Sequence, residues 1–125
     1  MRNTKEKTGE IIDIDVYRFV FETAIEIFDE IFEVSKDFPE EKVFLTEQLR
    51  KHAKQVCENL AEAWHVKNDK SALICRLSDA AQAASKAQTW LEYASKCQFL
   101  DQRTFQRLDT KYEDIFEVLC QGMKD

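Results

Sequence analysis

Apolar residues recur every three or four positions over most of the chain, which is the spacing of helices that pack against other helices. The first such segment is expected at residues 15–37. One apolar row runs along it, made of Tyr17, Val20, Ala24, Ile27, Ile31, Val34 and Phe38. A second row, Phe21, Ile25, Phe28 and Phe32, lies beside the first. Together they cover about half of the helix circumference, which is wider than the ~100° stripe of an ordinary surface helix.

The second row is the unusual feature of this segment. The first row is enough to fill a bundle core, so the phenylalanine-rich edge needs a further helix or another subunit to cover it. Soluble monomers rarely expose large contiguous apolar patches. We therefore expect Phe21, Ile25, Phe28 and Phe32 to form an oligomer interface.

Three more periodic segments follow, expected at residues 41–64, 69–97 and 102–122. Pro39 ends the first helix and suits the first turn of the second, where its missing N–H costs nothing. Asn68 or Asp69 is expected to cap the third helix, and Asp101 the fourth. The core rows are Leu45, Leu49, Ala53, Val56, Leu60 and Ala63; then Leu73, Leu77, Ala80, Ala84, Ala87, Leu91 and Ala94; then Phe105, Leu108, Tyr112, Ile115 and Leu119. Four alanines in the third row predict a close approach by a neighbouring helix.

Four such helices with short connections predict an all-α, antiparallel, up-down-up-down four-helix bundle. Two glycines and one proline in 125 residues support the absence of sheets and tight turns. We expect one domain over residues 11–125, preceded by a flexible tail at 1–10.

The chain shows no run of the ~20 apolar residues that a membrane helix needs, so no membrane association is expected. Residues 1–10 are polar and lack the apolar core of a secretory signal, which predicts a cytoplasmic protein. The four cysteines, Cys57, Cys75, Cys97 and Cys120, are then expected to be reduced and to act as small, half-buried apolar residues.

The net charge of −6 argues against bulk attraction to nucleic acid or to an anionic membrane. The charge is unevenly distributed, because acidic residues dominate 10–47 whereas basic residues are in excess over 48–86. An acidic first helix is thus followed by a mildly basic middle.

No motif for catalysis or cofactor binding is complete. Glu62 and His65 form one Glu-x-x-His motif, which is half of the ligand set of a di-iron bundle. A second motif is missing, because the residue three before the other histidine, His52, is Leu49. His52 and Cys57 are five residues apart and point in different directions on one helix. Two glycines cannot build a phosphate loop. We expect no catalytic residue, metal, cofactor or small-molecule substrate, and hence no enzyme.

The second helix carries a polar row beside its core: Gln48, His52, Gln55, Asn59 and Glu62. One interpretation is that Asn59 and Glu62 hydrogen-bond the facing helix and fix its register. The other is that they join Arg50, Lys51 and Lys54 in a surface for nucleic acid or a protein partner, since basic side chains bind phosphates. Trp64 and Trp90, at the ends of this region, are typical of a core or an interface.

Several short motifs resemble a known family. Phe38-Pro39-Glu40-Glu41, Leu45-Thr46, Gln48-Leu49-Arg50-Lys51, Ala53 and Asn59-Leu60-Ala61-Glu62 follow the spacing F-P-x-E-x-x-x-L-T-x-Q-L-R-R-A-A-x-S-I-x-x-N-I-A-E-G. This pattern is that of the four-helix-bundle proteins encoded in intervening sequences of bacterial 23S ribosomal RNA genes. Asp15-Val16-Tyr17, Ala87-Gln88-Thr89-Trp90-Leu91-Glu92 and Phe99-Leu100-Asp101 are also similar to that family. His52, Gln55, Ala63 and Lys86 depart from it, and the loss of glycine at 63 predicts a different turn.

The resemblance implies a bundle that assembles into a ring, commonly a homopentamer, with no enzymatic activity. A related branch of the family serves diversity-generating retroelements, where a basic ring binds the reverse transcriptase and RNA. The primary hypothesis is therefore a ring-forming interaction protein. The alternative is binding of RNA or a reverse transcriptase through Arg50, Lys51 and Lys54.

Overall fold

The computed structural model describes residues 13–123, which form four α-helices and no strand. They are α2 (Ile14–Ser35), α3 (Val43–His65), α4 (Lys70–Lys96) and α5 (Gln102–Met123), with a short 3-10 helix, η1 (Glu40–Lys42), before α3. The tail expected at residues 1–10 lies outside the described residues. The all-α class is confirmed.

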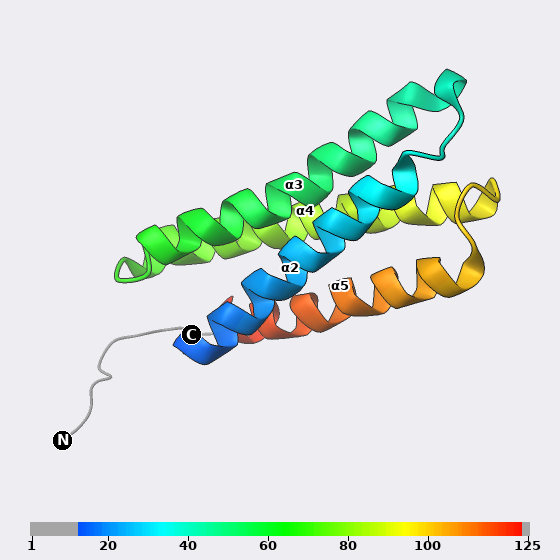
Figure 1. The fold of residues 1–125 in the computed structure, drawn as a ribbon. Helices are drawn as coiled ribbons and strands as arrows, with labels where there is room; N and C mark the ends of the chain where they lie inside the picture. The colour runs from blue at the N-terminus through cyan, green and yellow to red at the C-terminus, as the bar shows by residue number, and fades with distance from the viewer. Residues whose placement is uncertain (1–12, 124–125) are drawn as a thin grey trace.

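The four helices form a bundle in which each helix packs against the one before it, and α5 returns to contact α2. Figure 1 shows the chain passing back and forth along the long axis of the bundle, so that α2 and α5 lie side by side. The most extensive contact is between α3 and α4. No helix within residues 13–123 has the length and apolar character of a membrane span.

Aspartates cap the starts of three helices. Asp13 accepts hydrogen bonds from the backbone N–H groups of Asp15 (2.8 Å) and Val16 (3.3 Å), and Asp69 accepts one from Ala72 (3.2 Å). Asp101 accepts one from Thr104 at 2.7 Å. That hydrogen bond to Thr104 holds the pKa of Asp101 below its usual value. Of the two expected caps for the third helix, the structure uses Asp69.

The connection between α2 and α3 differs from the expected one. The first helix ends at Ser35 rather than at 37, and Phe38 follows it as a buried residue whose ring centroid lies 6.1 Å from that of Phe99. Pro39 has an extended ψ of 141° and precedes η1 instead of starting the α-helix, which begins only at Val43. A single 3-10 turn therefore separates the proline from α3.

The connection between α4 and α5 is a C-terminal helix cap built around a left-handed residue. Gln98 has a φ of 65°. The N–H of Phe99 donates to the carbonyl of Ala94 (2.9 Å), and the N–H of Gln98 donates to that of Ser95 (3.0 Å). These two bonds define a Schellman motif, in which glycine is the usual left-handed residue. The chain makes this turn without glycine.

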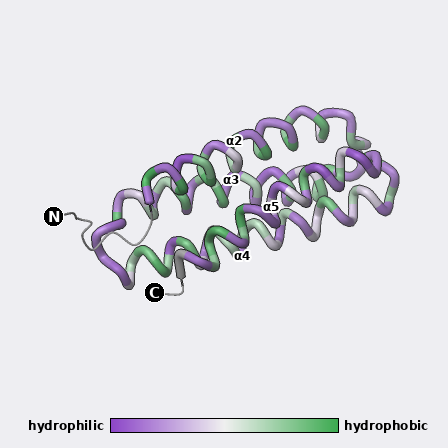
Figure 2. Tube along the Cα trace, turned by 90° about the horizontal axis from the view of Figure 1, so that it is seen from below, coloured by the Kyte–Doolittle hydropathy of each residue, from purple (hydrophilic) through white to green (hydrophobic). Residues whose placement is uncertain are grey.

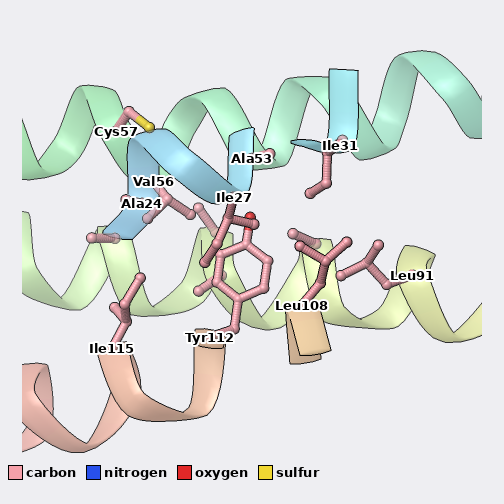
Figure 3. Packing of buried hydrophobic residues seen from close by; sticks show 14 of the residues in the cluster. Ala24, Ile27, Ile31, Ala53, Val56, Cys57, Leu91, Leu108, Tyr112 and Ile115 are labelled. Carbon is pink, nitrogen blue, oxygen red and sulfur yellow. The ribbon is translucent and has the colours of Figure 1, made fainter. Parts of the chain in front are cut away.

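The core is continuous along the bundle and contains the apolar rows expected from the sequence. Figure 3 shows Ile27, Ile31, Leu91, Leu108 and Ile115 converging from α2, α4 and α5. Figure 2 shows the corresponding alternation of apolar and polar positions along each helix. The seam alanines of α4, Ala80, Ala84, Ala87 and Ala94, are fully buried. Their small side chains account for the extensive contact between α3 and α4.

Tyr112 is fully buried in this core, and its hydroxyl has no hydrogen-bond partner among the described residues. Burial raises the pKa of Tyr112, so the side chain stays neutral. A buried polar group without a partner costs about 1–3 kcal/mol. We therefore expect Tyr112→Phe to raise the free energy of unfolding by about 1 kcal/mol, measured by urea denaturation.

Tyr17 provides a matched control, because its hydroxyl donates to the carbonyl of Leu60 at 2.9 Å. Tyr17→Phe removes that bond and is expected to lower the free energy of unfolding by about 0.5–1.5 kcal/mol. If Tyr112→Phe were as destabilising as Tyr17→Phe, the hydroxyl of Tyr112 would be hydrogen-bonded in solution and this account of the core would be wrong.

The cysteines are all free thiols, but they are not all half-buried as expected. Cys57 is buried in the core, and Cys97 is partly covered. Cys75 and Cys120 are exposed. Each is close in sequence to a core residue, Leu73 and Leu119 respectively, but lies on a different face of its helix. The expectation of half-burial is wrong for those two.

Candidate docking surfaces on the bundle

The phenylalanine-rich edge of α2 meets α3 at both of its ends, where Tyr17 stacks on Trp64 and Phe32 lies against Arg50. It comprises Ile14, Tyr17, Phe21, Ile25, Phe28 and Phe32, which we call the apolar row. Phe21, Ile25 and Phe28 are half-buried and pack against the chain's own core. Ile14 and Phe32, towards the two ends, are 46% and 41% exposed. The bundle thus covers one side of this row and leaves the other side open.

At the N-terminal end of α2, aromatic rings line a surface pocket of about 440 Å³. Tyr17 stacks on Trp64 of α3 with 4.6 Å between ring centroids, and on Phe21 with 5.8 Å. Burial raises the pKa of Tyr17, whose hydroxyl is held by Leu60. Lys67 places its ammonium 4.4 Å from the centroid of Trp64. This end of the row is rigid, aromatic and partly open to solvent.

At the C-terminal end of α2, Arg50 of α3 folds onto Phe32. Its guanidinium carbon lies 4.3 Å from the ring centroid, which is a cation–π distance. Arg50 Nε donates to Ser35 Oγ (2.8 Å), and Nη2 donates to the carbonyl of Phe32 (3.3 Å). Arg50 therefore binds the carbonyl of Phe32 in the last turn of α2, where a cation is favourable.

The three basic residues singled out in the sequence do not act together within the chain. Arg50 is turned towards α2, whereas Lys51 and Lys54 are exposed on α3. Lys54 lies 3.8 Å from Glu58 in an exposed ion pair. The structure instead brings two candidate sites into one place, because Arg50 of the basic set covers Phe32 of the apolar row.

A second exposed apolar surface lies where α3 meets α4, and the sequence reasoning did not find it. Phe44 is 62% exposed and packs edge-to-face on Trp90, with centroids 5.7 Å apart. Tyr93 also packs edge-to-face on Trp90, with 6.0 Å between the ring centroids. We call Phe44, Trp90 and Tyr93 the aromatic cluster. Its signal in the sequence was the position of Phe44 and Trp90 just outside the core rows of their helices.

The outer side of α2 is acidic. Glu22, Glu26, Asp29 and Glu33 follow one another at steps of three and four, are exposed, and border the apolar row. Towards α5, Glu30 forms an ion pair with Arg107, and Glu26, at the edge of the acidic side, places its Oε1 3.7 Å from Lys111 Nζ. These pairs join α2 to α5. Glu33 forms an exposed ion pair with Lys36 of the same helical end at 3.1 Å, and Glu22 and Asp29 are exposed to solvent.

The polar row of α3 is part of the boundary between α3 and α4. Arg76 of α4 donates to the side-chain oxygen of Asn59 at 3.4 Å, as expected for a residue that sets the register of two helices. His52 is buried, and its Nδ1 pairs with Gln55 Oε1 at 3.1 Å. Glu62 is exposed.

The residues considered for catalysis or metal binding do not gather into one site within residues 13–123. Glu62 and His65 are both exposed, and within residues 13–123 no three His, Cys, Asp or Glu side chains are grouped for a metal ion. Burial, with a smaller contribution from Asp29, raises the pKa of the Cys57 thiol to about 11. Cys57 is therefore a neutral core residue near pH 7.

Comparisons with known proteins agree on the fold. A family model described as 23S rRNA-intervening sequence protein matches residues 18–121. A solved structure from Bacteroides thetaiotaomicron, described as a protein with unknown function from the S23 ribosomal protein family, is similar at a TM-score of 0.78 and 17% identity. The alignment covers 88% of this chain and 99% of that one. No curated protein matches the chain.

Proposed function

Because the chain belongs to the 23S rRNA-intervening sequence protein family, we propose that it is a non-enzymatic interaction protein that assembles with copies of itself into a closed ring. A ring of five copies is what the resemblance to this family implies. Its partner in the first instance is a second copy of the same chain, docked through the apolar row of α2.

The observation that supports this proposal is the incomplete cover of the apolar row. Phe32 keeps 41% of its surface exposed even with Arg50 and Lys36 placed against its ring. Phe21, Ile25 and Phe28 continue the same surface along α2 as half-buried side chains. An apolar strip of this kind, rimmed by charged residues, is typical of a protein–protein contact surface.

The charge around the row favours a contact between unlike surfaces. Two copies that paired their α2 helices face to face would bring Glu22, Glu26, Asp29 and Glu33 of each copy together, and like charges repel. A contact of α2 with the more basic α3–α4 side of a neighbour avoids that cost. Such head-to-tail contacts close into rings when the rotation between copies permits it.

Size-exclusion chromatography with light scattering tests the proposal on the wild-type chain. We expect a mass that is a multiple of 14.7 kDa, and five copies for the ring size implied by the family. Raising the salt concentration should weaken the assembly moderately, since part of the contact is electrostatic. A stable monomer across the micromolar range would contradict the proposal.

Direct binding of RNA or a reverse transcriptase through Arg50, Lys51 and Lys54 is the alternative, and the geometry favours it less. Arg50 is engaged with Phe32 and Ser35, and Lys54 is paired with Glu58. Phosphate contacts from these residues would give an affinity for RNA that falls steeply with salt.

A further inference from the structure

A closed ring needs two different docking surfaces on every copy, because a head-to-tail contact joins one patch to another that is not identical to it. The apolar row of α2 provides one of them. We propose that the aromatic cluster of Phe44, Trp90 and Tyr93 is the other, and that the apolar row of one copy docks onto the cluster of the next. This inference rests on the proposed ring and specifies how it closes.

The exposure of the cluster is the first argument. Phe44 and Tyr93 are 62% and 41% exposed although they contact Trp90, so the chain itself leaves this surface open. The three rings come from two helices and are nearly perpendicular, at 82° and 90°. Aromatic residues gathered in this way are the ones most enriched in the centres of protein interfaces.

The position of the two surfaces is the second argument. The apolar row meets α3 at both of its ends, and the cluster lies between α3 and α4, so they occupy adjacent faces of the bundle that share α3. Docking between adjacent faces turns each copy relative to the last, which suits a closed ring rather than a straight filament.

The Phe32 end of the apolar row lies at a similar level along the bundle to the aromatic cluster. Phe32 is held against Arg50 of α3, and Phe44 precedes Arg50 by less than two helical turns. A ring without a rise along its axis needs its two contact surfaces at nearly the same height, and the Phe32 end of the row and the cluster meet that condition.

The third argument is charge. Exposed Lys51 lies two turns after Phe44 on the same side of α3, and exposed Lys86 lies one turn before Trp90 on α4. Glu47 lies one turn after Phe44 on α3, and the exposed Glu40 and Glu41 of η1 precede it. The two lysines can face the exposed carboxylates of Glu22 and Asp29 beside the apolar row of the docked copy.

The test begins with one variant on each surface: Phe44→Glu removes the cluster, and Phe32→Glu removes the end of the apolar row. Each variant alone is expected to run as a monomer, whereas the wild type assembles. Phe19→Glu is the matched control. Phe19 is an exposed phenylalanine of α2, 52% accessible, that lies off both surfaces, so this variant should assemble like the wild type. Circular dichroism confirms that all three variants keep their helical content.

Mixing the two monomeric variants then tests whether the surfaces bind each other. Phe32→Glu retains an intact cluster, and Phe44→Glu retains an intact apolar row, so an equimolar mixture at high concentration can form one good contact per pair. We expect a heterodimer with the mass of two chains and nothing larger. Its formation should move the fluorescence emission of Trp90 to shorter wavelength as the cluster is covered.

The outcomes are distinct. If the wild type assembles but Phe44→Glu assembles equally well, the cluster is not the second surface and this inference fails while the proposed function stands. If both variants are monomeric but the mixture forms no heterodimer, the two surfaces do not bind each other and the inference also fails. A monomeric wild type removes the proposed function itself.

Discussion

Replacing Phe32 by glutamate is expected to convert the assembled protein into a 14.7 kDa monomer without unfolding it. In the assembly the new carboxylate would be buried against apolar side chains of a neighbour, which costs several kcal/mol when it has no partner. In the free chain the same carboxylate would lie beside Arg50 and Lys36, whose charged groups now flank the ring of Phe32. Sedimentation velocity measures the mass, and circular dichroism the helical content.

Phe32 is a sharper probe than Phe28 for this purpose. Phe28 packs against the chain's own core, so a charge there would damage the fold and the assembly together. The Phe19→Glu variant adds the same charge to the same helix at an exposed site away from the row. Loss of assembly in both variants would mean that the net charge of α2, and not the apolar row, controls association.

The second large effect is expected inside the bundle, at the alanine seam of α4. Ala84 is fully buried where α4 meets its neighbours, and Ala84→Leu adds side-chain volume for which a close-packed core has no space. Overpacking of this kind costs about 1–3 kcal/mol. We expect the free energy of unfolding to fall by that amount in urea denaturation.

Ser85→Leu is the control for the seam, since Ser85 is the next residue of α4 and is exposed. The change in volume is similar, but the new side chain points into solvent, and the stability should change by less than about 0.5 kcal/mol. Equal effects of Ala84→Leu and Ser85→Leu would show that the close approach of α4 does not depend on its small residues.

The sequence predicted the fold well because helix-forming periodicity is a local property. The expected core rows of all four helices lie in the observed core, except that Tyr17, Val34 and Phe105 are only partly buried against it. The aspartates at 69 and 101 cap helices as expected. The connection around Pro39 was less predictable. A proline with a fixed φ fits either the first turn of an α-helix or the residue before a 3-10 turn, and only packing of the buried Phe38 distinguishes them.

The candidate surfaces were predictable only in part. Periodicity places Phe32 and Arg50 on their own helices, but the alignment of α2 against α3 determines that they touch. For the same reason Phe44 and Trp90 looked unrelated until the α3–α4 register brought them into one cluster. Side chains that are distant in the sequence form a surface through the fold, which a single sequence does not specify.

Arg50 illustrates the same point for charge. In the sequence it is one of three neighbouring basic residues and indicates a phosphate-binding surface. In the structure its donors are directed to the hydroxyl of Ser35 and the carbonyl of Phe32, because the last turn of α2 lies within reach of its guanidinium. The local environment of a charged residue, more than its neighbours in the sequence, determines what it binds.

Native mass spectrometry of the wild-type chain tests most directly whether the protein forms a closed ring. The method counts the copies in each particle, and the account predicts one dominant stoichiometry, five, with few intermediates, because closure adds a final contact at no further loss of freedom. A spectrum of single chains, or a ladder of open chains that lengthens with concentration, would contradict it.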